Sequence, residues 1–134
     1  MPDSKPQTTL ARGHRAETAA AEYLTRQGLT LIDRNVRAGH GEIDLIMQDG
    51  STLVFVEVRA RKVGAWVSAE ESISRGKRLK VIETAERLLN ERPTWRQRPC
   101  RFDVVAIGLP AGSSSGPDSA QTEVNWIQDA FQAE

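Results

Sequence analysis

Two alternating segments around Asp49-Gly50 constrain the fold of this chain more than any other feature. Residues 42–48 (EIDLIMQ) and 51–59 (STLVFVEVR) are rich in apolar residues that favour strands, and they alternate between apolar and polar side chains at the ends away from the turn. An Asp-Gly pair between two such segments is one of the strongest local signals for a tight hairpin turn. The sequence therefore predicts an antiparallel β-hairpin.

The turn also predicts which side chains share a face of the hairpin. With Asp49-Gly50 as the two turn residues, Gln48 lies opposite Ser51, and directly opposed residues point to the same side. One face is then almost wholly apolar and needs a helix to cover it; it carries Ile43, Leu45, Met47, Thr52, Val54, Val56 and Val58. The other face carries Glu42, Asp44, Ile46, Leu53, Phe55, Glu57 and Arg59.

Three carboxylates gather on the second face. Glu42 lies opposite Glu57 in this register, and Asp44 is a diagonal neighbour of Glu57, at about 7–8 Å. Like charges this close are unfavourable unless a cation lies among them, and carboxylate oxygens suit Mg²⁺, Mn²⁺ or Ca²⁺. The alternative is a solvent-facing strand surface on which Arg59 neutralises Glu57. A register that differs by one residue would separate Asp44 from Glu57 and remove the metal interpretation.

Helices and further strands are indicated along the rest of the chain. Apolar residues recur at helical spacing in residues 10–27 and 74–90, and Pro93 ends the second helix. The remaining segments are strands at residues 29–36, 101–109 and 123–127, with a short helical end at 128–131.

This order of elements, α-β-β-β-α-β-β, predicts the fold class. It is an α/β (α+β) fold with a mixed central sheet flanked by helices. The 134 residues are enough for one domain. Residues 1–9 are expected to be a disordered tail, 10–134 a single domain, and 110–121 a flexible loop within it.

Charge is unevenly distributed along the chain although it sums to zero. The 18 basic and 18 acidic side chains exclude only a uniformly basic nucleic-acid binder. Residues 41–58 hold four acidic and no basic side chains, and residues 59–104 hold twelve basic and six acidic ones. An acidic site beside a basic segment fits a protein that holds cations and attracts an anionic polymer, although ordinary surface charge accounts for the same counts.

The sequence also indicates where the protein works. Its one cysteine, Cys100, excludes an internal disulfide and suits a reducing compartment. Residues 1–9 lack the apolar stretch of a signal peptide, and the longest apolar runs, 53–56 and 104–107, are far shorter than a membrane span. We therefore expect a cytoplasmic protein without membrane contacts.

Several short motifs resemble those of known proteins. The spacing Asp44-x12-Glu57-x-Arg59 is similar to the D…ExK motif of restriction-endonuclease-like nucleases. The blocks GEIDLI (41–46), FVEVRAR (55–61) and RFDVV (101–105) resemble signature blocks of the YraN family of small bacterial proteins, over about residues 11–109. Single positions that also fit this family are Gly13, Ala16, Glu17 and Lys77.

The resemblance implies a restriction-endonuclease-like fold, similar to that of archaeal Holliday-junction resolvases, and a metal-dependent nuclease. Asp44 and Glu57 match the two metal-binding carboxylates, and Glu17 matches the acidic residue that resolvase-like members bring to the same Mg²⁺ or Mn²⁺. Arg59 completes the implied catalytic set and stands where many nucleases have a lysine. Arginine stays charged and cannot help to activate water as a lysine can, so Arg59 would instead stabilise charge that builds on the phosphorus.

The implied nuclease would hold its substrate with the basic segment. Phosphate contacts are expected from Arg61, Lys62, Arg75, Lys77, Arg78 and Lys80. Lys77 has two interpretations, a side chain that reaches the carboxylates and one that is simply solvated. Trp66 would stack on an unpaired base.

Three functions fit these features. The first is a metal-dependent nuclease acting on DNA, branched or structured DNA included, and the second is a nucleic-acid-binding protein that retains the fold without turnover. The third is an interaction protein whose acidic face is structural. Arg59 favours the second over the first, and the basic segment disfavours the third. Asp103 is expected to be structural, and Trp126 to anchor the core or the interface of a homodimer.

Overall fold

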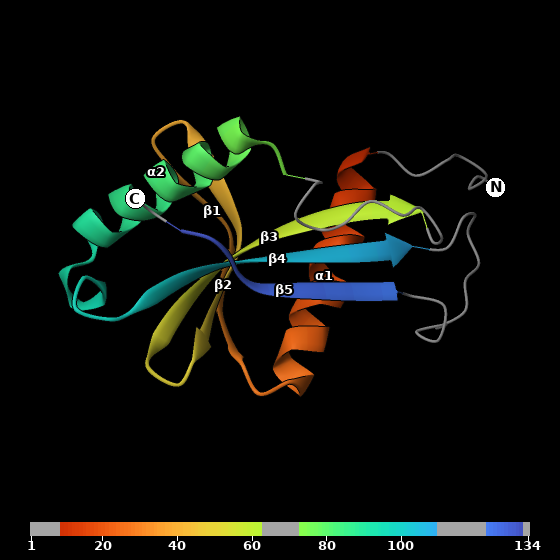
Figure 1. The fold of residues 1–134 in the computed structure, drawn as a ribbon, viewed down its shortest axis with the longest axis horizontal. Coiled ribbons are helices and arrows are strands. Elements are labelled where there is room, and N and C mark those ends of the chain that lie inside the picture. The colour runs from red at the N-terminus through yellow and green to blue at the C-terminus, as the bar shows by residue number, and fades with distance from the viewer. Residues whose placement is uncertain (1–8, 63–72, 110–122, 133–134) are drawn as a thin grey trace.

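The computed structural model describes residues 9–62, 73–109 and 123–132. Within these ranges the elements follow the order that the sequence predicts, so the α+β fold class is confirmed. Figure 1 shows their arrangement. Their bounds are α1 Thr9–Arg26, β1 Thr30–Ala38, β2 Gly41–Asp49, β3 Thr52–Lys62, α2 Arg75–Glu91, the 3₁₀ turn Pro93–Trp95, β4 Cys100–Leu109 and β5 Glu123–Phe131.

The five strands form one mixed sheet in the order β1-β2-β3-β4-β5. Neighbouring strands are antiparallel except β3 and β4, which are parallel. Since parallel neighbours need a long crossover, α2 falls between them in the chain. The two helices pack on opposite faces of the sheet, and the sheet is strongly twisted (Figure 1).

The hairpin of β2 and β3 forms, but with a different register from the predicted one. Asp49 lies opposite Thr52, so Gly50 and Ser51 are the turn residues and Gly50 adopts a φ of 62°. Asp49 stays in the strand, where its carboxylate pairs with Arg101 at 3.0 Å. The observed register differs from the predicted one by two residues. Since side chains alternate with a period of two, those near the turn still point to their predicted faces.

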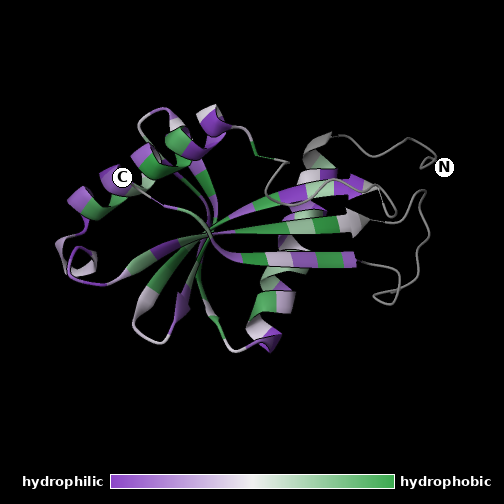
Figure 2. Ribbon diagram, viewed as in Figure 1, coloured by the Kyte–Doolittle hydropathy of each residue, from purple (hydrophilic) through white to green (hydrophobic). Residues whose placement is uncertain are grey.

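The two faces of the hairpin are covered as expected. Leu45, Met47, Val54 and Val56 are buried with apolar residues of α1, and Ile46, Leu53 and Phe55 with apolar residues of α2. Figure 2 shows that hydrophobic residues run through the strands, while α2 carries hydrophilic residues between its hydrophobic ones. The sheet is therefore the middle layer between the two helices.

The side chain of Ile43 is an exception, and its predicted face was wrong. It packs with the residues of α2, not with those of α1. Its cross-strand partner Val36 packs there too, although Arg34, two residues before it, approaches Glu17 of α1. Between them Asn35 has a φ of 52°, a left-handed conformation that breaks the alternation of a strand. The paired strands β1 and β2 thus change faces at this point.

The C-terminal strand also differs from the prediction, because residues 128–131 continue β5 and form no helix. Asp129 has a φ of 53°, and the pairing of β4 with β5 is irregular between Phe102 and Val104. The buried carboxylate of Asp103 accepts hydrogen bonds from the Asp129 N–H and from Trp126 Nε1, both at 2.9 Å. It therefore fixes an extended, bulged strand at this place.

These contacts confirm two expectations about single residues. Asp103 is structural, since it also accepts a hydrogen bond from Arg101 at 3.1 Å. Trp126 is a packing anchor, with its ring edge-to-face on Tyr23 at 6.1 Å between centroids. Trp66, the loop at 110–121 and residues 1–8 of the predicted tail lie outside the described ranges, and Thr9 belongs to α1.

The second helix begins and ends close to its predicted bounds. The Ser74 hydroxyl accepts a hydrogen bond from the Lys77 N–H at 3.1 Å and so caps its first turn. The helix ends at Glu91, two residues before Pro93. Among the described helices, neither is long and apolar enough to cross a membrane.

Candidate functional site

Asp44 and Glu57 lie side by side where β2 leaves β3. The paired residues of the two strands extend from the turn to Leu45 and Val56, and one further step puts Asp44 across from Glu57. There the Asp44 side chain, in place of a backbone carbonyl of β2, accepts a hydrogen bond from β3: its Oδ2 accepts from the Val58 N–H at 2.9 Å. Asp44 and Glu57 are thus neighbours as predicted, but Asp44 takes the position across from Glu57 that the predicted register assigned to Glu42. The predicted position of Glu42 was wrong, because the register differs by two residues and Glu42 pairs with Arg37 of β1.

Glu57 is held in an unusual environment for a charged group. Its side chain is buried, with 2% of the residue exposed. One oxygen, Oε2, lies 3.2 Å from Lys77 Nζ, whereas Oε1 is buried and finds no hydrogen-bond donor among the described residues. Burial, together with the negative charge of Asp44, raises the pKa of Glu57 to about 7, although Lys77 and Arg59 oppose the change. Burying a carboxylate without full pairing costs stability, and groups perturbed in this way are concentrated at functional sites.

Asp44 is half-buried and feels the same charges. Burial raises its pKa above the usual value, whereas the hydrogen bond from Val58 and the positive charges of Lys77 and Arg59 lower it. Glu17 of α1 is also near enough to be affected, since its pKa is raised by burial and by the charge of Asp44. The charge of Asp44 therefore acts on a carboxylate of α1 and on a carboxylate of β3.

Glu17 is positioned by β1. Its Oε1 accepts a hydrogen bond from Asn35 Nδ2 at 2.9 Å and lies 3.7 Å from Arg34 Nη2. In the described part of the chain, no three Asp, Glu, His or Cys side chains come close enough together to hold a metal ion. The structure thus brings Glu17 near Asp44 without gathering Glu17, Asp44 and Glu57 around one point.

The pair of Asp44 and Glu57 nevertheless fits a magnesium ion. Mg²⁺ is usually held by one or two carboxylates, with water and substrate phosphate completing its coordination. The pair offers hard oxygen donors, and the buried Glu57 Oε1 is an acceptor that the described residues leave without a donor. These two residues alone can therefore provide the protein ligands of such an ion.

Two cations border the carboxylates. Lys77, in the first turn of α2, reaches them, and its side chain is 41% exposed, so its ammonium group faces both Glu57 and solvent. Arg59, half-buried on β3, lies close enough that its charge lowers the pKa values of Asp44 and Glu57. Of the two interpretations of Lys77, the structure selects the one in which it reaches the carboxylates.

The other predicted phosphate-binding residues are divided between two sides of α2. Arg75 and Arg78 line a broad surface groove with Leu79 and Phe131, whereas Lys80 lines a smaller hollow beside the turn between β1 and β2. Arg61 is half-buried on β3, and the side chain of Lys62 is not among those that the structure describes. One nucleic-acid strand on one side of α2 therefore cannot meet all of them.

Sequence reasoning missed the residues that position Glu17. Asn35 and Arg34 carry no motif, and the one available signal is that asparagine tolerates the left-handed conformation better than most residues. Their role depends on β1 lying against α1, which only the folded chain shows.

Comparison with known proteins gives the chain a family. The sequence profile described as "Uncharacterised protein family UPF0102" matches residues 16–107. The chain belongs to the UPF0102 family. A UPF0102 protein of Pseudomonas aeruginosa is 44% identical over 122 residues, covering 91% of this chain and 93% of the relative. For Ectopseudomonas mendocina the identity is 46% over 121 residues (90% and 94%), and for Pseudomonas fluorescens 45% over 131 residues (98% of both).

The YraN family is the same family as UPF0102, so the resemblance seen in the sequence is confirmed. The part that matches the UPF0102 profile runs from the middle of α1 to β4. It includes Glu17, Asp44, Glu57, Arg59 and Lys77. The UPF0102 similarity thus covers every element that contributes to the site.

Proposed function

We propose that this protein is a metal-dependent nuclease that hydrolyses phosphodiester bonds in DNA, branched or structured DNA included. The observation that carries the proposal is the buried Glu57 carboxylate beside Asp44, with an oxygen that has no donor among the described residues and a pKa of about 7. Buried polar atoms without partners are rare in folded proteins and concentrate at functional sites. A divalent cation would offset the repulsion between Asp44 and Glu57, and it would supply the contact that the buried Glu57 oxygen lacks.

The residues present define what each would do. Asp44 and Glu57 would hold Mg²⁺ or Mn²⁺, which supplies an acidic water and polarises the phosphate when it is bound. The Lys77 ammonium, partly exposed beside Glu57, offers fixed positive charge to an incoming phosphate. Arg59 adds a second fixed charge from β3. Glu17, held by Asn35 and Arg34, keeps negative charge next to Asp44 and so favours cation binding.

Cleavage by matched variants tests the proposal. Wild type, Asp44→Asn, Glu57→Gln and Glu22→Gln are incubated with duplex, single-stranded and junction DNA in Mg²⁺ or Mn²⁺. Glu22 is an exposed carboxylate on α1 and serves as the control. We expect cleavage by wild type and the Glu22 variant, and a loss of at least roughly a hundredfold in the other two. Equal cleavage by all four would show a contaminating nuclease and refute the proposal.

A second candidate is a nucleic-acid-binding protein without turnover. The observation that favours it is the contact between Lys77 and Glu57, which already balances one carboxylate, together with Arg59 in place of a lysine. It predicts DNA binding by wild type with no cleavage of any substrate in either metal. Titration calorimetry with Mg²⁺ separates the two candidates further. The nuclease should bind the ion, whereas the binding protein without turnover should show no heat of Mg²⁺ binding.

The proposal includes a cytoplasmic location and a homodimer. The free, exposed thiol of Cys100 suits a reducing compartment. A two-fold arrangement would suit a two-fold substrate such as a junction. Light scattering after gel filtration measures the mass, and a monomer at micromolar concentration would contradict the dimer.

A further inference from the structure

A small hollow separates the turn between β1 and β2 from α2. Ala38, His40 and Gly41 form one wall, and Lys80, Thr84 and Arg87 form the other together with Glu83. Its volume is about 70 Å³. Sites for drug-sized ligands occupy roughly 300–1,000 Å³, and one water needs roughly 10–15 Å³, so the hollow has the size of a small ion such as phosphate. It is too small for a nucleoside.

Two glycines fix the distance between the walls. A Cβ on Gly41 would overlap the hydroxyl of Thr84, and a Cβ on Gly39 would lie 2.6 Å from Arg87 Nε. The Thr84 hydroxyl is itself held, because it donates a hydrogen bond to the Lys80 carbonyl at 2.8 Å. Gly39 has a φ of 62°, which other residues seldom adopt. The backbone of the turn therefore lies directly against the side chains of Thr84 and Arg87 on α2.

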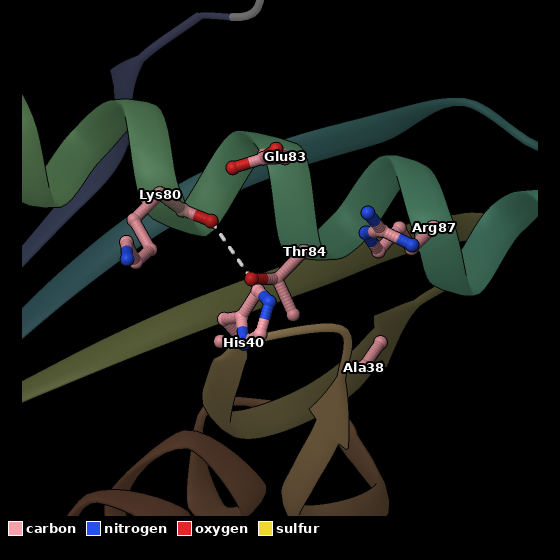
Figure 3. A pocket seen from close by; sticks show the side chains of 7 residues that line it. Ala38, His40, Lys80, Glu83, Thr84 and Arg87 are labelled. Carbon is pink, nitrogen blue, oxygen red and sulfur yellow. Dashed lines mark hydrogen bonds between the residues drawn. The ribbon is translucent and has the colours of Figure 1, made fainter.

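The charges around the hollow favour an anion. Figure 3 shows Lys80 and Arg87 on either side of Thr84, above the turn that carries His40. Across the described ranges, no carboxylate lies within ion-pair distance of Lys80 or Arg87. Glu83 is the one acidic residue of the lining, and it is drawn on the upper side of the helix (Figure 3). Two cations that have no acidic partner among the described residues, and one imidazole, thus border a phosphate-sized space.

The hollow lies on the same side of α2 as Lys77, the residue that contacts Glu57. Lys77, Lys80, Thr84 and Arg87 are spaced by three, four and three residues, so they lie along one side of the helix. The axial rise from Lys77 to Arg87 is about 15 Å. This length exceeds the spacing of neighbouring phosphates on one nucleic-acid strand, so a backbone along this side would present more than one phosphate to the helix.

We propose that the hollow between the β1–β2 turn and α2 binds a backbone phosphate of the nucleic-acid strand whose reactive phosphate lies at Asp44 and Glu57. This inference rests on the proposed function. Lys80, Arg87 and His40 hold the phosphate, and Gly39 and Gly41 allow the turn to approach it. The strand then runs along α2 from Lys77 to Arg87. Arg75 and Arg78, on the far side of the helix, are outside its course.

Binding without cleavage tests the inference. A labelled 20-nucleotide single strand and its duplex are titrated in EDTA with wild type, Lys80→Gln, Arg87→Gln and the control Arg26→Gln, at several salt concentrations. Arg26 is an exposed arginine at the end of α1, which packs on the other face of the sheet. We expect each of the first two variants to weaken binding roughly three- to tenfold and to lower the salt slope by about one.

A change of opposite sign makes the test sharper. Glu83→Gln removes the acidic residue of the lining and should tighten binding roughly two- to fivefold, whereas Glu22→Gln on α1 should leave it unchanged. If wild type binds DNA but the Lys80 and Arg87 variants match Arg26→Gln, the hollow is not a phosphate site and the inference fails alone. If wild type fails to bind DNA at low salt, the proposed function fails as well.

Inorganic phosphate separates a backbone site from a site for free phosphate. In a ¹H–¹⁵N spectrum, phosphate at millimolar concentration should shift the amide signals of Gly39, His40 and Gly41, and the labelled DNA should abolish that response. A response to phosphate that DNA does not abolish would assign the hollow to the free ion and overturn the inference. Absence of any response to phosphate or DNA at these amides would overturn it too.

Discussion

Replacing Glu57 by glutamine is expected to stabilise the protein at alkaline pH and to change its stability little at acid pH. Folding raises the pKa of Glu57 from 4.5 to about 7, so the folded state holds this proton more tightly than the unfolded state. The free energy of unfolding therefore falls as the pH rises from about 4.5 to about 7. At about 1.4 kcal/mol for each pKa unit, the loss from this one group is about 3 kcal/mol. Glutamine does not ionise, so the Glu57→Gln protein does not lose this free energy.

Urea denaturation at pH 4.5, 6 and 8 measures this difference, with Glu22→Gln as the exposed control. The Glu57→Gln protein should match wild type at pH 4.5 and exceed it by about 3 kcal/mol at pH 8, while the control stays within about 0.5 kcal/mol at each pH. A Glu57→Gln protein that is less stable than wild type at pH 8 would refute the reasoning. It would show that the contact with Lys77 outweighs the cost of burial.

The same variant reports on the metal. A cation that binds only the folded protein at a hundred times its dissociation constant adds about 2.7 kcal/mol to stability. At pH 8, Mg²⁺ should therefore raise the Tm of wild type and of Glu22→Gln, and should leave that of Glu57→Gln unchanged. Equal shifts in all three proteins would place the ion elsewhere on the surface.

Two further predictions concern the framework of the fold. Asp103→Ala removes a buried acceptor that serves Trp126 and Asp129 and should cost about 3–5 kcal/mol in urea denaturation; a cost below 1 kcal/mol would contradict its structural role. Gly41→Ala, whose Cβ meets the Thr84 hydroxyl, should cost about 1–3 kcal/mol. Thr84→Ala should recover part of that loss, so a double-mutant cycle should give a coupling of at least about 0.5 kcal/mol, and strict additivity would argue against the contact.

The elements of the fold were predictable because their signals are local. Alternation, helical spacing and turn residues located both helices and all five described strands. The errors came where a distant residue overrides the local pattern. Residues 128–131 look helical by composition, but the buried Asp103 carboxylate holds the backbone of Asp129 in a bulge of β5. Ile43 alternates correctly in the sequence, but the conformation of Asn35 turns its part of the hairpin to the other face.

The candidate site was predictable in part for the same reason. The sequence placed Asp44 and Glu57 on one face as diagonal neighbours, and the two-residue error in register changed which carboxylate lies across from Glu57 but kept Asp44 beside it. The contact of Lys77 with Glu57 depends on how α2 lies across the sheet, and the sequence left that open between two interpretations. The hollow at His40 was missed, because its residues come from a turn and a helix about 40 positions apart and share no motif.

The sequence by itself determined that this chain forms a hairpin with two carboxylates on one side, because hydrophobic alternation and turn chemistry act between neighbours. The tertiary structure alone decided how strongly those carboxylates are perturbed. It buries Glu57, brings Lys77 to one of its oxygens and leaves the other without a donor among the described residues. Burial and charge depend on everything that packs around a group, and elements far apart in the chain supply most of it here. The chemistry of this site therefore arises from the packing of α1 and α2 on a hairpin that the sequence had already specified.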